Sequence, residues 1–187
     1  MPDKEPPSCV IPLHTPSLKE YAFFLLSGIV VSIPFALFFE QLSAVVPAIL
    51  TIVILAPFIE ELAKVFPLFY RHGETERSIV NLGLLLGLGF GITEFALYVF
   101  VGGVPFTIRL PGIIFHASSA TIIAYGVAKK NPWPYYLIAA MLHVANNLFA
   151  EVSSLGFGIL FELLILISTY MLAWNFYRKT SKEKIVV

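Results

Sequence analysis

The sequence has little charge and almost no cysteine. Only 13% of its 187 residues are charged, well below the roughly 25% of an average soluble domain. Lys and Arg number 12, as do Asp and Glu, so the net charge is zero and no basic stripe marks a nucleic-acid-binding face. The single cysteine, Cys9, cannot form an internal disulfide. These shortages disfavour a soluble enzyme, and nucleic acid is not an expected partner.

Apolar residues make up 58% of the chain, and the mean hydropathy is +0.85. They form six long runs that do not alternate, which excludes a β-barrel and favours membrane helices. The runs are 18–39, 42–70, 79–101, 107–128, 135–150 and 153–177. The sequence therefore predicts an all-α, polytopic membrane bundle of about six transmembrane helices over 18–177. A flexible cytoplasmic tail (1–17) is expected before it and a basic cytoplasmic C-terminus (178–187) after it.

The positions of Lys and Arg predict the orientation in the membrane. With six spans, ten of these residues fall on the side of the termini, Arg109 falls alone on the other side, and Lys64 lies within a span. The ten are Lys4, Lys19, Arg71, Arg77, Lys129, Lys130, Arg178, Lys179, Lys182 and Lys184. Cytoplasmic loops carry the excess of positive charge, so both termini are expected in the cytoplasm of an integral protein of the cell membrane.

Two of the six runs have unusual lengths. The second would be about 43 Å long as one helix, against a hydrocarbon core of about 30 Å. Pro57 and Pro67 are expected to kink it, and Pro57 would leave the carbonyl of Val53 without its helical donor. The fifth run is short, about 24 Å, which can thin the bilayer locally.

Charged and polar side chains interrupt the apolar runs. They are Glu60, Glu61 and Lys64 in the second run, Glu94 in the third, His116 in the fourth, His143 and Asn147 in the fifth, and Glu162 in the sixth. Each charge near a span centre costs about 2.5–3.5 kcal/mol, so such residues are functional by default. Counted along the helices, Glu60, Glu94, His116 and His143 fall within one slab about 10 Å thick.

Helical spacing indicates which of these residues share a face. Glu60 and Lys64 are four residues apart and are expected to pair, whereas Glu61 is turned away by about 100°. His143 and Asn147 also share a face.

The third run contains Gly83, Gly87 and Gly91, a spacing typical of close helix packing. Glu94 lies near the same face and is expected to point inward. Glu162 has no partner one turn away and is expected to be structural.

These residue types suit hydrolysis without a covalent intermediate. No serine or cysteine nucleophile motif is present, and no HEXXH motif. A carboxylate with a histidine suits general-base activation of water, and a second histidine with an asparagine suits an oxyanion. Two histidines and a carboxylate also form a common zinc set, which here would be Glu60, His116 and His143.

Four motifs in order resemble the PrsW family of intramembrane proteases, which is related to the CAAX prenyl endopeptidases. They are Glu60-Glu61-Leu62-Ala63-Lys64, GLGFGITEFALY at 87–98, His116 followed by Gly126, and His143-x-x-x-Asn147. The match covers about 42–150. The CAAX relatives carry EExxxR, so the spacing of Lys64 favours the PrsW branch. Phe95 departs from the pattern, because PrsW-like sequences often have Asn there.

The resemblance implies an intramembrane endopeptidase of the glutamic type that cleaves a membrane protein or a lipidated peptide. Glu60 would activate water with the help of His116, and His143 with Asn147 would form the oxyanion hole. Glu61, Lys64 and Glu94 would support these residues or position the substrate. No cofactor is expected on this mechanism, with zinc as the alternative.

Two other functions fit the same pattern. One is a non-catalytic scaffold or binding protein on the same fold. The other is a small proton- or ion-coupled transporter that uses Glu60, Glu94 and Glu162 as a relay, although no repeat between the two halves supports it.

Overall fold

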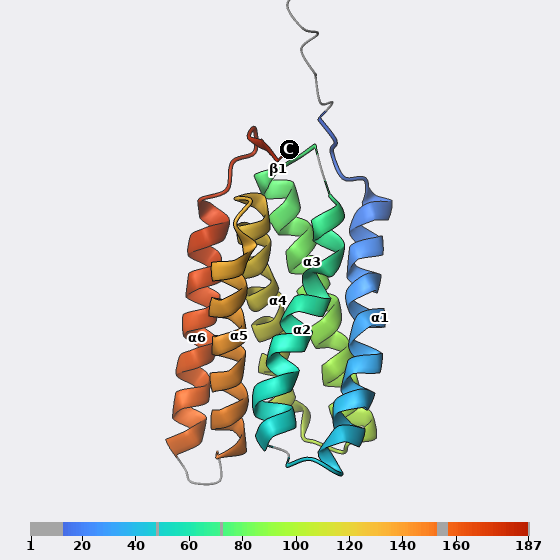
Figure 1. The fold of residues 1–187 in the computed structure, drawn as a ribbon, viewed down its shortest axis with the longest axis vertical. Coiled ribbons are helices and arrows are strands. Elements are labelled where there is room, and N and C mark those ends of the chain that lie inside the picture. Colours follow the sequence, from blue (N-terminus) through green and yellow to red (C-terminus); the bar gives the residue numbers. More distant parts are fainter. Residues whose placement is uncertain (1–12, 48, 72, 153–156, 187) are drawn as a thin grey trace, which may run out of the picture.

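The computed structural model describes residues 13–47, 49–71, 73–152 and 157–186. Long helices stand side by side and run between two common ends of the molecule (Figure 1). The helices are α1 (Leu18–Ser43), α2 (Ala56–Val65), α3 (Glu76–Ala96), α4 (Phe106–Ala128), α5 (Pro132–Glu151) and α6 (Phe157–Arg178). Shorter elements are the π-helices η1 (Ile49–Leu55) and η3 (Leu97–Val101), the 3-10 helix η2 (Phe66–Tyr70), and the strands β1 (Glu74–Thr75) and β2 (Ile185–Val186).

The prediction of a helical membrane protein is confirmed. Four helical stretches are long and apolar enough to cross a membrane: Leu18–Ser43, Glu76–Val101, Phe106–Ala128 and Gly158–Arg178. The two remaining predicted spans do not reach this standard among the described residues. One is divided into η1, α2 and η2. The other is α5, whose mean hydropathy is lowered by polar side chains such as His143 and Asn147.

The second predicted span, 42–70, is not one helix, because two prolines change the helix type. Pro57 and Pro67 lie at the first or second positions of α2 and η2. In the π-helix η1 a carbonyl pairs five residues ahead, so Ile52 would need the N–H that Pro57 lacks. The Asn147 side chain supplies it instead, with Nδ2 donating to the Ile52 carbonyl at 2.9 Å. The carbonyl that receives a side-chain donor is thus that of Ile52, one residue before Val53, whose carbonyl was expected to be free.

The fifth predicted span, 135–150, is longer than expected. Helix α5 has 20 residues and begins at Pro132, so it is about 30 Å long. Proline is well tolerated in the first turn, where its missing N–H would have no helical partner. The prediction of a short span is therefore wrong.

Helix α3 packs closely on both α1 and α4 through glycine. A Cβ on Gly87 would lie 2.2 Å from the His116 carbonyl oxygen, and one on Gly83 would lie 2.3 Å from the Ala124 Cβ. On the other face, a Cβ on Gly89 would meet a backbone oxygen of α1 at 2.1 Å. The predicted close-packing face is confirmed, and it fixes the position of the α4 turn that carries His116.

Both described ends of the chain meet at one end of the bundle. Strands β1 and β2 pair antiparallel there, with Glu74 opposite Val186. The His14 backbone N–H donates to the Gly73 carbonyl at 2.8 Å, so at least residue 14 of the predicted flexible tail is held in place. Residues 1–12 lie outside the described part.

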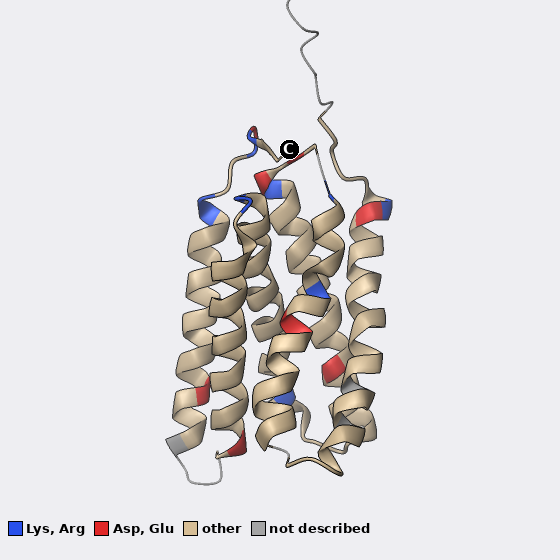
Figure 2. Cartoon of the chain, in the orientation of Figure 1, with Lys and Arg blue, Asp and Glu red and all other residues tan. Residues whose placement is uncertain are grey.

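Ion pairs reinforce this end, where Lys and Arg gather in Figure 2. Lys129 and Lys184 contact Glu76 at 2.7 and 3.4 Å, and Arg71 contacts Glu20 at 2.6 Å. Four segments predicted to face the same side of the membrane are thereby joined.

We predict that Gly87→Ala destabilises the protein by about 1–3 kcal/mol, because the new methyl group overlaps the α4 backbone. The matched control is Gly112→Ala in α4, where a Cβ meets nothing within 4 Å. This control should be neutral or stabilising by about 0.5–1 kcal/mol. Reversible unfolding in detergent with increasing SDS measures both variants, and equal effects would contradict the packing described.

Candidate functional site

The polar residues predicted from the sequence converge inside the bundle. Helix α2 provides Glu60, Glu61 and Lys64, α3 provides Glu94, α4 provides His116, and α5 provides His143 and Asn147. Of these, Glu61 and Lys64 have no exposed surface, and the two histidines and Glu60 are buried. Direct contacts link the charged and histidine side chains into one cluster, termed the polar cluster below, which consists of Glu60, Glu61, Lys64, Glu94, Arg109, His116 and His143.

The partner of Lys64 is Glu61 and not Glu60, which corrects the predicted pairing. Lys64 Nζ lies 2.8 Å from Glu61 Oε1. It also lies 2.9 Å from His116 Nδ1 and 4.7 Å from the centre of the Phe90 ring. The ammonium group is therefore drawn toward α3 and α4. A residue three positions back on the helix offers the carboxylate on that side.

Glu61 is the most heavily bonded carboxylate of the polar cluster. Its Oε1 atom accepts from Lys64 and from the Ser119 hydroxyl at 3.0 Å, and lies 2.9 Å from His143 Nδ1. Oε2 is buried and has no hydrogen-bond partner among the described residues. Glu61 thus joins α2, α4 and α5 through one oxygen.

Hydrogen bonds assign the protonation of His116. An ammonium group has only donors, so His116 Nδ1 accepts from Lys64 and the ring proton lies on Nε2. Nε2 then donates to Glu94 Oε2. Glu94 is further bonded to Arg109, whose Nη2 lies 3.5 Å from Oε1 and whose guanidinium stacks 3.7 Å from the Tyr98 ring centre. Both ring nitrogens of His116 are therefore engaged.

His143 has the opposite tautomer. Its Nδ1–H donates to the Glu61 carboxylate, so in the neutral ring the lone pair lies on Nε2. Nε2 lies 4.0 Å from Glu60 Oε2. This separation is longer than a hydrogen bond and within reach of one bridging water. Glu60 thus lies beside His143, not beside His116 as the predicted roles require.

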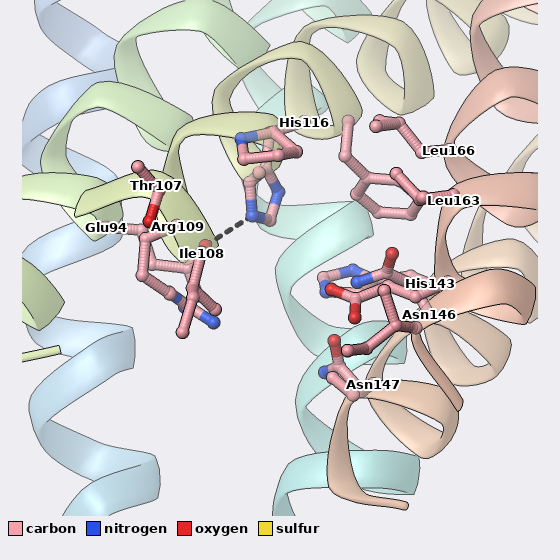
Figure 3. A pocket seen from close by; sticks show the side chains of 16 residues that line it. Glu94, Thr107, Ile108, Arg109, His116, His143, Asn146, Asn147, Leu163 and Leu166 are labelled. Atoms are coloured by element: carbon pink, nitrogen blue, oxygen red, sulfur yellow. Dashed lines mark hydrogen bonds and ion pairs between the residues drawn. The ribbon is translucent and has the colours of Figure 1, made fainter. Parts of the chain in front are cut away.

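Two cavities adjoin the polar cluster. The first has a volume of about 290 Å³ and lies between α4, α5 and α6. Its polar lining residues include Glu94, Arg109, His116, His143, Asn146, Asn147 and Glu162. Figure 3 shows Glu94 and Arg109 on one side of it and His143, Asn146 and Asn147 on the other. The second cavity, of about 270 Å³, is lined by Glu60 and by residues of α1, η1 and η3. Glu94 and Asn147 line both cavities.

Three residues of the site were missed by sequence reasoning. Ser119 belongs to none of the predicted motifs, but it lies one turn after His116 on α4 and its hydroxyl reaches Glu61. Arg109 was treated only as a marker of orientation, although a lone cation at the far end of the bundle is a natural partner for Glu94. Asn146 lies three residues after His143, a spacing that also shares a helix face, but only Asn147 matched a motif.

The polar cluster does not fit a metal ion in the arrangement shown. Donor atoms of Glu61, His116 and His143 lie within 4.8 Å of one another. This set contains Glu61 where the sequence suggested Glu60. However, the Lys64 ammonium contacts two of the three ligand residues, Glu61 and His116. A positive charge already occupies the position that a cation would need, so repulsion opposes metal binding while Lys64 is protonated.

Comparisons of the chain with protein-family models, with curated proteins and with solved structures give no match. The fold and site define a class, a helical membrane protein with a buried glutamate–histidine–lysine cluster. The resemblance to the PrsW family stays a prediction that rests on its four motifs.

Removing the Lys64 ammonium should leave an uncompensated buried carboxylate. We predict that Lys64→Met destabilises the protein by about 3–5 kcal/mol, measured by the same SDS unfolding. The double variant Lys64→Met with Glu61→Gln should recover part of this loss, because the unpaired charge is gone. Lys182→Met, at an exposed position, is the control and should stay within about 0.5 kcal/mol. A Lys64→Met protein as stable as this control would contradict the buried ion pair.

Proposed function

We propose that the protein is an intramembrane endopeptidase of the PrsW family that hydrolyses peptide bonds of membrane-associated substrates. The observation that carries this proposal is the pair formed by Glu60 and His143. The two side chains are buried, are separated by 4.0 Å and adjoin cavities within the bundle. A carboxylate and an imidazole this close can hydrogen-bond to the same water molecule, and the pair is therefore suited to holding and deprotonating a nucleophilic water.

The proposed reaction begins with a water bound between Glu60 and His143. One hydrogen atom of this water is donated to His143 Nε2 in a hydrogen bond that orients the molecule. The second hydrogen atom passes as a proton to the Glu60 carboxylate while the water oxygen attacks the peptide carbonyl carbon. The new C–O bond pushes an electron pair onto the carbonyl oxygen. Glu60 then gives its proton to the amine nitrogen as the C–N bond breaks, so the carboxylate is regenerated.

Asn147 is the proposed donor to the oxyanion. Its Nδ2 group carries two hydrogens, and one is used on the Ile52 carbonyl. The second hydrogen is available beside both cavities, which Asn147 lines. A donor anchored in this way is preorganised, which is what oxyanion stabilisation requires.

The remaining members of the polar cluster position this machinery. Glu61 holds the His143 ring so that Nε2 faces Glu60. Lys64 balances the charge of Glu61, while His116 connects Lys64 to Glu94. His116 therefore acts through its neighbours in this proposal, and its ring nitrogens do not contact the water.

We further propose six membrane spans with both termini in the cytoplasm. Four helices meet the requirements for a span alone, and α5 with the η1–α2–η2 stretch lies among them (Figure 1). The excess of Lys and Arg at the end where the termini meet supports the orientation (Figure 2). The substrate is then a membrane protein or a lipidated peptide.

A zinc-dependent protease is the second candidate, favoured by the close approach of Glu61, His116 and His143. It requires Lys64 to lose its proton or to move away. Because the ammonium group contacts two of these three residues, the metal-independent mechanism is preferred.

Replacing Glu60 removes the proposed base. We predict that Glu60→Gln lowers the cleavage rate of a transmembrane or lipidated peptide by about 10²–10⁴-fold, with an unfolding midpoint close to that of the parent. Glu151→Gln, at the exposed end of α5, is the matched control and should retain full activity. Full activity in Glu60→Gln would refute the assignment. A parent protein that cleaves no such peptide would favour the scaffold.

Chelation separates the two mechanisms. We predict that EDTA or phenanthroline leaves the cleavage rate unchanged, and that elemental analysis of the purified active protein finds less than one zinc per chain, because Lys64 already supplies the positive charge. Activity that is lost on chelation and restored by Zn²⁺ would instead establish the zinc-dependent version.

A further inference from the structure

The second cavity is bounded by both π-helical segments of the described structure. Ile52 of η1 and Leu97, Tyr98 and Val101 of η3 line it, together with Leu37 and Phe39 of α1. π-helical turns are rare and occur frequently at functional sites, where they displace side chains from the regular helical positions. Two of them facing the same cavity indicate that its shape matters.

The burial of its lining changes along the cavity. At the inner end Phe39, Ala56 and Glu60 are 4%, 5% and 7% exposed. At the outer end Leu37 is 48% exposed and Val101 is 80% exposed. Exposed apolar side chains on a membrane bundle face lipid. The cavity therefore leads from the outer surface of the bundle, near the ends of α1 and η3, to the Glu60 carboxylate.

The two cavities differ in chemistry. The first is rich in polar groups such as Arg109, Asn146 and Glu162, whereas the second is mostly apolar away from its inner end, with Ser43 and Tyr98 as its other polar side chains. Since Glu94 and Asn147 line both, an extended chain crossing that junction would place one flank among polar groups and the other among apolar ones.

We propose that the second cavity is a specificity subsite that takes a large apolar side chain next to the scissile bond of a substrate entering from the lipid between α1 and η3. This inference rests on the proposed function. A substrate is the occupant argued for, because the cavity ends on Glu60, Glu94 and Asn147. A lipid chain would place its methyl end against these polar groups and leave them without partners.

Leu97 provides a test, because it lines only the second cavity among the cavities described. Peptides that differ only in one residue beside the cleaved bond, Phe or Ala, are compared in nanodiscs. The parent should prefer Phe by about tenfold in kcat/KM. Leu97→Trp, which fills the cavity, should lose or reverse this preference, while Leu97→Ala should keep it and accept a larger naphthylalanine.

The control is Leu137→Trp, a lipid-exposed leucine of α5 that lines neither cavity, and it should retain the preference of the parent. A parent without preference for an apolar side chain at either flank would overturn the subsite. An equal loss of kcat/KM for both peptides in Leu97→Trp would also overturn it. That result is expected if a lipid occupies the cavity or if the variant only destabilises the fold.

A binding experiment keeps the subsite testable if no peptide is cleaved. The Glu60→Gln protein is irradiated with a transmembrane peptide that carries benzoylphenylalanine at successive positions, and the crosslinked residues are mapped. Crosslinks to Leu37, Leu97 or Tyr98 support the subsite even if the parent proves inactive, in which case only the proposed function fails. Crosslinks confined to the first cavity, or to lipid alone, overturn the subsite even if the parent cleaves its substrates.

Discussion

The buried ion pair between Glu61 and Lys64 is the interaction on which the site depends. Both side chains are withdrawn completely from solvent, which is costly unless each charge is paired and hydrogen-bonded. Here the carboxylate also receives Ser119 and His143, and the ammonium donates to His116. The pair therefore sets both tautomers: His116 must accept at Nδ1, and His143 must donate at Nδ1. Only His143 is left with a lone pair directed toward Glu60.

Backbone irregularities hold the helices that carry these side chains. Pro57 frees the Ile52 carbonyl, and Asn147 of α5 donates to it. About three turns away on the same helix, the Tyr136 hydroxyl donates to the Phe58 carbonyl at 2.9 Å. The Asn147 bond aligns α5 along η1 and α2, since neither lipid nor regular helix satisfies a carbonyl freed by proline. The Tyr136 bond adds a second contact between α5 and α2. The same asparagine is thus both a structural link and a proposed oxyanion donor.

The sequence predicted which residues form the site better than it predicted which of them contact one another. Apolar runs interrupted by glutamate and histidine located α2 to α5 and their common depth, because the cost of burying charge in lipid is independent of tertiary detail. The glycine face of α3 was predictable from the four-residue spacing of its glycines, which is typical of close helix packing. The choice between Glu60 and Glu61 was not, because a lysine side chain reaches three or four residues back equally well.

Interhelical contacts decided that choice. His116 and Phe90 draw Lys64 toward one side of α2, and only the folded structure places them there. The contact between Arg109 and Glu94 likewise depends on how α3 and α4 pack at the far end. The length of α5 was mispredicted because the polar and proline residues at its start resembled a loop, whereas proline in a first turn favours a helix.

The balance of charge within the polar cluster singles out Glu60. Lys64 offsets Glu61, and Arg109 offsets Glu94, while the hydrogen bonds assign His116 as a neutral ring, and the proposed reaction uses His143 as a neutral ring too. Glu60 is the one carboxylate in excess of the two cations, and its nearest ionisable contact in the described structure is the lone pair of His143. Taking up a proton stabilises a carboxylate in that position more than it stabilises a carboxylate paired with a cation. In the proposed reaction the nearest proton source is the water held against His143. The neighbouring ion pairs thus leave Glu60 as the group best placed to act as the base.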